Sequence, residues 1–181
     1  MNSKSYCCND ISDFCRRDRN EDDSCKRNRR PQSTTTLKCS TPSTVTIPIL
    51  ADPGSTFPTT SLSLKTPENS NCCTRLDFTS NIVVPVGFLG TLSFQIFKQC
   101  RNQLTPVPVG PAFTFARTVA LVVGETSTFS FFICDCDFAC DDECCTYSVL
   151  ITNLSAITLG ATISSATLSA ISTCDEKTCK C

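Results

Sequence analysis

The sequence predicts an all-β fold, an eight-stranded jelly-roll sandwich that follows a flexible N-terminal arm. Apolar and polar residues alternate with a period of two in many short segments, turn residues separate these segments, and no stretch has a convincing helical period. Eight short antiparallel strands in about 140 residues are typical of a two-sheet sandwich, for which the jelly roll is the commonest eight-strand solution. An immunoglobulin-like sandwich is the alternative, although the chain has no tryptophan to fill its core.

Eight segments have the composition of β-strands. The alternation is clearest in residues 91–96, where Leu92, Phe94 and Ile96 share one face. The expected strands are residues 34–39, 44–49, 75–84, 91–96, 112–123, 126–134, 146–151 and 156–171. Turn residues, chiefly proline and glycine, lie at residues 52–54, 66–69, 87–90, 106–111 and 124–125.

The chain divides into three segments. Residues 1–31 mix acidic and basic side chains, and Ile11 and Phe14 are the only large apolar residues of their charged central stretch. Such a segment cannot bury enough surface to order itself, so we expect a connector arm that is disordered until assembled. Residues 32–173 form the predicted sandwich, and residues 174–181 form a cysteine-containing C-terminal tail.

Cysteine is the most informative residue type in the chain. The sequence has 16 cysteines among 181 residues, a density typical of disulfide scaffolds or metal binders. Disulfide scaffolds are usually short because their bridges compensate for a small core, whereas this chain is 40% hydrophobic and can bury a core of ordinary size. Many of the thiols are therefore expected to serve contacts between chains.

Composition also excludes several classes of function. The chain has no histidine, which excludes Ser-His-Asp and Cys-His catalysis, and we expect no enzyme. The net charge of −1 gives no reason to expect nucleic acid as a partner, and no stretch of about 20 residues is apolar enough to span a membrane. The first residues contain no apolar run typical of a signal peptide. An oxidised protein without that signal requires leaderless export or deposition on a spore from inside a mother cell, unless its thiols stay reduced and hold metal.

Two of the three vicinal cysteine pairs lie in or next to expected strands, where successive side chains point to opposite faces. Cys145 shares its parity with apolar residues and Cys72 does the same, so both are expected to point inward and to bond within the domain. Cys73 and Cys144 are expected to point outward. Outward thiols are candidates for bonds to a partner chain.

The segment from Cys134 to Cys144 gathers thiols and carboxylates, which are also the ligands of many metal sites. Zinc sites usually contain two separated Cys-x2-Cys knuckles, and the turn glycine and late glutamate of a calcium loop are absent here. We expect a polar loop that is held by disulfides between its own cysteines, with no bound metal ion and no cofactor.

The arm and the domain together resemble a known family. An arm with Cys7-Cys8 followed by Cys15 and Cys25, ahead of a cysteine-bearing eight-strand domain, is similar to the endospore-appendage pilus subunits of spore-forming Firmicutes. Residues 88–100, 129–137 and 144–149 also resemble cysteine-rich domains of clostridia and bacilli.

The resemblance implies a self-assembling structural protein of the spore surface. Such subunits stack as jelly rolls into a fibre, are made in the mother cell, and bond through an N-terminal arm to preceding copies of themselves. Cys7 and Cys8 would be intermolecular disulfide donors, with Cys15 or Cys25 as the further connector cysteine. The acceptors would lie in the domain, with Cys100, Cys134 and Cys144 as candidates. Other spore-surface proteins are possible partners as well.

Three alternatives remain open from the sequence. The chain is alternatively a thiol-rich metal-binding or redox protein. It is alternatively a spore coat or exosporium component that does not polymerise, or a tip adhesin that uses the same sandwich to hold a ligand.

Overall fold

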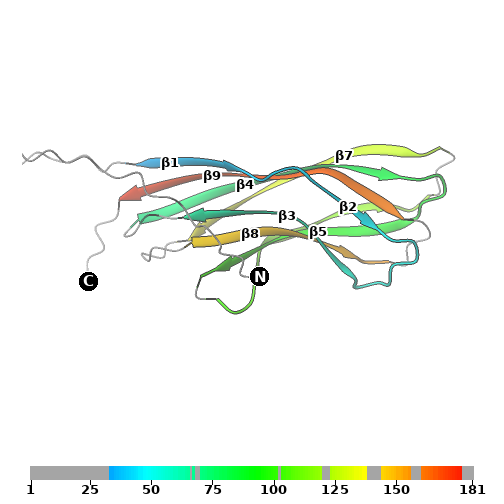
Figure 1. The fold of residues 1–181 in the computed structure, drawn as a ribbon, viewed down its shortest axis with the longest axis horizontal. Coiled ribbons are helices and arrows are strands. Elements are labelled where there is room, and N and C mark those ends of the chain that lie inside the picture. The colour runs from blue at the N-terminus through cyan, green and yellow to red at the C-terminus, as the bar shows by residue number, and fades with distance from the viewer. Residues whose placement is uncertain are drawn as a thin grey trace, which may run out of the picture.

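Two antiparallel sheets pack face to face, as shown in Figure 1. The computed structural model describes residues 33–65, 67, 70–101, 103–119, 123–137, 144–155 and 160–176. The described chain contains strands and turns and no helix. The nine strands are β1 (Thr34–Cys39), β2 (Ser43–Ile47), β3 (Thr56–Lys65), β4 (Ser70–Val84), β5 (Gly90–Cys100), β6 (Val107–Arg117), β7 (Glu125–Asp137), β8 (Cys144–Asn153) and β9 (Ala161–Glu176).

The strand order is that of a jelly roll. One sheet, here called the β9 sheet, has the order β2-β9-β4-β7, and β1 pairs with the far half of β9 along the same edge. The other sheet, here called the β8 sheet, has the order β3-β8-β5-β6. The chain thus crosses repeatedly between the sheets, as in two interlocked Greek keys. The predicted all-β sandwich is confirmed, with nine strands in place of eight.

Two differences from the expected strands have one physical cause. The strand β3 was not predicted, and β6 begins at Val107, inside a proline-containing segment that was predicted as a turn. Proline lacks the backbone N–H that a central strand must donate, and so it is confined to edge strands. Both strands are edges of the β8 sheet, where Pro58 of β3 and Pro108 of β6 are tolerated.

The core lies between the inner faces of the sheets. Leu76, Phe78 and Ile82 of β4 face Phe94 and Ile96 of β5, and each is at most 1% exposed. The Phe78 and Phe94 ring centroids are 5.9 Å apart, which joins the two layers. Burial of one such side chain stabilises the fold by roughly 1.5–3 kcal/mol relative to exposure.

The two open sides of the sandwich are closed differently. On one side, Phe113 of β6 stacks on Phe131 of β7 with ring centroids 4.3 Å apart. On the other side the contacts are polar, because Thr60 Oγ1 donates a 2.6 Å hydrogen bond to Ser40 Oγ and Lys38 Nζ donates one of 2.8 Å to the Ser63 carbonyl.

The last strand corrects the predicted C-terminal boundary. Residues 174–181 were expected to form a tail, but β9 continues to Glu176 and Cys174 is a buried part of it. With 16 residues at about 3.3 Å each, β9 spans roughly 50 Å and runs the length of the sandwich (Figure 1).

The two ends of the sandwich are distinct. Strands β1, β4 and β8 begin at one end, where β5, β7 and β9 finish, and we call it the cysteine end (Figure 1). At the opposite end lie the connections from β2 to β3, β4 to β5, β6 to β7 and β8 to β9. We call that end the apolar tip, for reasons given below.

Candidate functional site

Disulfides fasten neighbouring strands at the cysteine end. Each bond joins residues that are directly opposite in the strand register. Together the bonds link β4 to β9, β4 to β7 and β5 to β8. The pairs in the described chain are Cys72–Cys174, Cys73–Cys136 and Cys100–Cys145, with sequence separations of 102, 63 and 45 residues.

The vicinal pair in β4 clamps the strands on both of its sides. Cys72 points inward, is 8% exposed, and bonds to Cys174 of β9. Cys73 points outward and bonds to Cys136 of β7, and both of these cysteines are exposed. Alternation in the strand therefore places Cys72 and Cys73 on the faces that the sequence predicts. The expectation that Cys73 offers a thiol to a partner needs correction, because its sulfur is bonded within the domain.

Two further cysteines are exposed on the outer face of the β9 sheet. Cys39 and Cys134 are exposed and form no disulfide in the described chain. Cys134 is opposite Arg75, and Cys39 is opposite Ser169, which is in turn opposite Asp77. The two thiols thus lie in adjacent cross-strand rows. We call the surface carrying Cys39, Cys73, Cys134 and Cys136 the thiol face.

Arg75 provides a fixed positive charge on the thiol face. Its Nη2 donates a 2.9 Å hydrogen bond to Asp77 Oδ1, and its guanidinium carbon lies 4.5 Å from the Phe132 ring centroid. The pKa of Arg75 lies above its ordinary value, first because of the hydrogen bond to Asp77, then because of the negative charge of Asp77, and slightly because of Cys134. The guanidinium therefore stays charged beside the Cys134 thiol.

Apolar side chains accompany these groups on the thiol face. Leu37 is 67% exposed, Phe132 is 57% exposed and Ile171 is 43% exposed. Large exposed apolar side chains gathered near polar ones are typical of contact surfaces.

Asp135 anchors the strand that carries two of the thiol-face cysteines. Its side chain points inward, where Oδ2 accepts a 2.7 Å hydrogen bond from the Tyr147 hydroxyl and lies 3.1 Å from Lys98 Nζ. Both partners belong to the β8 sheet, so the carboxylate ties the edge strand β7 to the opposite layer. Residues 134 and 136, on either side of Asp135, must then point outward.

The predicted donors of the intermolecular disulfides lie outside the described residues, whereas the predicted acceptors lie within them. Cys7, Cys8, Cys15 and Cys25 lie outside the described residues. Among the acceptors, Cys134 is exposed and Cys144 is half-buried at the start of β8. Cys100 is 3% exposed and bonded to Cys145, so its sulfur is not available to another chain in this structure.

Sequence reasoning missed Cys39 as a candidate. Cys39 ends an expected strand, but its shared parity with the apolar Leu37 would have indicated an inward side chain. The missing information was that β1 is an edge strand whose residues are all exposed.

The described residues contain no group of three or more histidine, cysteine or acidic residues placed to hold a metal ion. Residues 138–143, the middle of the segment weighed as a metal site, lie outside them. No helix long and apolar enough to cross a membrane is found in the same part of the chain.

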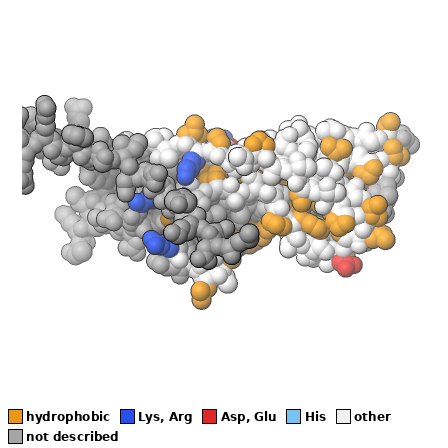
Figure 2. Space-filling model, in the orientation of Figure 1, with side chains coloured by type: hydrophobic (Ala, Val, Ile, Leu, Met, Phe, Trp, Pro, Cys, Tyr) orange, Lys and Arg blue, Asp and Glu red, His pale blue; other side chains and the backbone are white. Residues whose placement is uncertain are grey.

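The opposite end carries apolar side chains in its connections. Figure 2 shows hydrophobic side chains gathered over this end, with the lysines and arginines on the other half of the same view. Isolated exposed apolar residues are ordinary, but a group of them marks a contact surface. The residues of the apolar tip that are at least half exposed are Ile49, Leu50, Val86, Val119, Val123 and Leu154.

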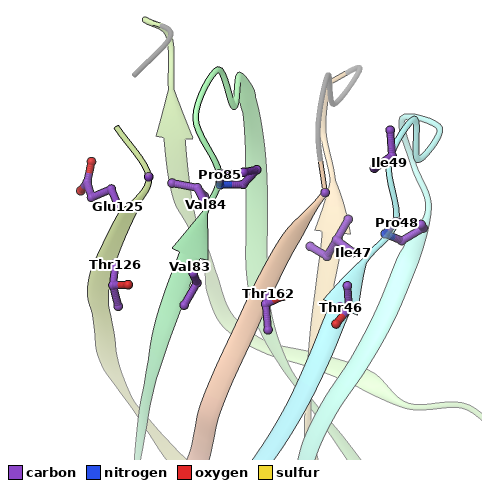
Figure 3. A pocket seen from close by; sticks show the side chains of 12 residues that line it. Thr46, Ile47, Pro48, Ile49, Val83, Val84, Pro85, Glu125, Thr126 and Thr162 are labelled. Atoms are coloured by element: carbon purple, nitrogen blue, oxygen red, sulfur yellow. The ribbon is translucent and has the colours of Figure 1, made fainter. Parts of the chain in front are cut away.

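A groove of about 690 Å³ lies at this tip (Figure 3). Its floor is a cross-strand row of the β9 sheet in which Val83 and Thr46 are both opposite Thr162. Gly160 is part of its lining, and an added Cβ there would lie 2.8 Å from the Ile47 carbonyl oxygen. The walls and remaining lining are Ile47, Pro48, Ile49, Val84, Pro85, Gly124, Glu125 and Thr126.

Leu50 has a backbone conformation that its residue type disfavours. Its φ is +59°, in the left-handed region, and its side chain is 76% exposed. Asparagine or glycine adopts this conformation at lower cost. An unfavourable leucine that is not buried suggests a role outside the fold of the single chain.

Fold and site together define a disulfide-stapled jelly-roll domain with an exposed thiol face. The chain belongs to a family known as a domain of unknown function, DUF4489, whose model matches residues 33–173. No curated protein matches the chain.

Among solved structures, similarity extends to chains of infectious bursal disease virus. For the Gx strain structure the identity is 13% and the TM-score 0.39, over 81% of this chain and 36% of that chain. For the Gt strain structure the identity is 11% and the TM-score 0.23, over 81% of this chain and 42% of that chain. This chain thus spans well under half of either viral chain.

Proposed function

We propose that the chain is a structural subunit that self-assembles into a disulfide cross-linked fibre or appendage on the endospore surface. The observation that carries the proposal is the difference between its ends. Among the described residues, the exposed cysteines lie on the thiol face toward one end of the sandwich, and most of the exposed large apolar side chains lie at the other end. A contact between two different patches is heterologous, and such contacts produce open filaments when the rotation between copies does not close.

The noncovalent contact joins the apolar tip of one copy to the cysteine end of the next. Leu104, between β5 and β6, is 98% exposed at the cysteine end, and Val107 beside it is 42% exposed. The groove at the tip is lined largely by apolar residues. An apolar side chain on one patch and an apolar groove on a distant patch are the elements of a non-closing contact.

The covalent contact joins the arm to the thiol face. The arm, residues 1–31, precedes β1 at the cysteine end, and about 30 extended residues reach on the order of 100 Å, twice the length of β9. Cys7 and Cys8 are the donors, and the acceptor lies on the thiol face of a neighbouring copy, where Cys39 and Cys134 are exposed thiols. A spore-surface location is supported by the family resemblance of the arm.

Electrophoresis of the oxidised full-length protein with and without reductant tests the proposal. We expect a ladder of covalent multimers that collapses to monomer on reduction. Deletion of residues 1–31 should abolish the ladder and leave the melting temperature of the domain unchanged. A protein that is monomeric in both lanes would contradict the proposal.

The variant Leu104→Asp tests the noncovalent contact. We expect the variant to fold and to lose filaments, because it places a charge in an apolar contact. Leu154→Asp is a less severe control, since that leucine lies at the tip but does not line the groove. Equal filament yields for Leu104→Asp and the unmodified chain would exclude Leu104 from the contact.

A further inference from the structure

The Cys73–Cys136 disulfide differs from the others of the described chain in its surroundings. Both of its cysteines are exposed on the thiol face, whereas no cysteine of the other two disulfides is more than 8% exposed. A disulfide exchanges when a thiolate attacks one of its sulfurs, and access to that sulfur limits the rate. Among the three, this disulfide is the one that another molecule can reach.

Its immediate neighbours leave that approach open. The cross-strand row that contains the disulfide continues through Thr173 to Thr35, and both threonines are exposed and small. Cys134 lies two residues before Cys136 on the same face, also exposed. Among the described residues, the cross-strand row of the disulfide therefore contains no bulky side chain.

We propose that the Cys73–Cys136 disulfide is a thiol–disulfide exchange site, and that its substrate is a cysteine thiol of a second copy of this chain. The proposal rests on the proposed function and names the reaction that forms its cross-link. The internal disulfide is then the electrophile, and the thiol face is an acceptor that is already oxidised.

The exchange balances without any other reagent. The incoming thiol loses its proton, and the resulting thiolate forms a bond to the sulfur of Cys73 or Cys136. The internal S–S bond breaks, and its electron pair leaves with the other cysteine, which takes up a proton. One disulfide and one thiol are present before and after, so no oxidant is consumed.

The need for an oxidant distinguishes Cys39 and Cys134 from the exchange site. Those two cysteines are thiols, so a bond from either of them to an arm thiol requires an oxidant that accepts two electrons. Cross-linking without an oxidant is therefore the distinguishing property of the exchange site.

The test uses the full-length protein with its disulfides intact. Isotopically heavy and light copies are mixed in oxygen-free buffer, free thiols are blocked with an alkylating agent at intervals, and disulfide-linked peptides are identified by mass spectrometry. We expect heavy–light peptides in which Cys73 or Cys136 is joined to a cysteine of the other copy, with the number of free thiols per chain constant.

A pair of variants supports the mapping. Cys73→Ser combined with Cys136→Ser should reduce the oxygen-free rate of cross-linking at least tenfold, whereas Ser130→Ala, on the same face of β7, should leave it unchanged. Thermal unfolding shows whether the double variant folds, and the peptide mapping in the unmodified protein decides the question if it does not.

Two results would overturn the exchange site and are distinguishable from each other. If cross-links form only after an oxidant is added, and they join Cys39 or Cys134, exchange is wrong and the fibre proposal stands. If no cross-link forms with or without oxidant, both proposals are wrong.

Discussion

The two ends of this sandwich hold their strands together by different means. At the cysteine end, disulfides join β4 to both of its neighbours and β5 to β8. At the apolar tip, the described residues contain no cysteine, and the connections are held by hydrogen bonds and close backbone contacts. One fold thus separates a covalently fixed surface from a surface that depends on packing.

The tip shows this dependence in a single buried side chain. Asn153 is 0% exposed, and its Nδ2 donates hydrogen bonds of 2.7 Å to the Ala51 carbonyl and 3.1 Å to the Asp52 carbonyl. Its backbone also pairs with Ser55 and Gly54. The side-chain amide of Asn153 therefore positions the connection from β2 to β3, whereas disulfides join the strands at the cysteine end.

The largest expected effect comes from removing a buried disulfide of the cysteine end. Replacing both Cys72 and Cys174 with alanine should lower the free energy of unfolding by about 3–5 kcal/mol, because the bond closes a long loop in the unfolded chain. Urea unfolding of the monomeric fraction measures the change. Cys39→Ala is the matched control, and we expect it to remain within about 0.5 kcal/mol of the unmodified chain. An equal loss of unfolding free energy in the two variants would show that the Cys72–Cys174 disulfide adds no stability beyond that of an unbonded cysteine.

The second effect tests packing at the tip. Gly160→Ala places a Cβ 2.8 Å from the Ile47 carbonyl oxygen, so the backbone must shift, at a cost of about 1–3 kcal/mol. Gly124→Ala is the control in the same groove, since its nearest atom is 3.4 Å away. Thermal unfolding of the two variants compares them, and a similar midpoint for both would show that the tip is loosely packed.

The third effect has the opposite sign. Leu50→Asn should raise the free energy of unfolding of the single chain by on the order of 1 kcal/mol, because asparagine tolerates left-handed backbone better than leucine. The same change should reduce filament yield, because it removes an exposed apolar side chain from the tip. Val86→Asn removes apolar surface without relieving backbone strain, so its stability should not rise. A stabilised Leu50→Asn that assembles normally would exclude Leu50 from the contact.

The smallest effect is a pH dependence at the tip. The pKa of Glu125 lies below its ordinary value, first because Ser127 donates a hydrogen bond to its carboxylate; desolvation opposes this, and the hydrogen bond and charge of Arg117 lower the pKa further. A lowered folded-state pKa contributes stability that is present above the ordinary value and is lost as the pH falls through the lowered value. Glu125→Gln should therefore lose part of the acid sensitivity of the melting temperature. Identical acid profiles of variant and unmodified chain would contradict this assignment.

The parity of side chains along a strand was predictable from the sequence. Alternation at period two identifies the all-β class and places Cys72 and Cys145 inside, because it depends on local sequence alone. The partner of Cys73 was not predictable, because it depends on the register between strands that lie 63 residues apart in the chain.

The edge strand β3 and the groove could not be predicted from local sequence either. The strand β3 was missed because Pro58 and a run of threonine and serine weaken its signal, and its edge position appears only once the sheet order is known. The groove joins residues 46–49, 83–85, 124–126, 160 and 162, which come together only through the jelly-roll topology.

Negative-stain microscopy of oxidised full-length protein, before and after addition of reductant, shows whether the chain forms fibres. We expect filaments in which copies repeat tip to cysteine end, and we expect arm cysteines in the cross-links of covalent multimers recovered from them. A uniform field of single particles under oxidising conditions, at concentrations where the disulfides of the cysteine end are intact, would contradict this expectation.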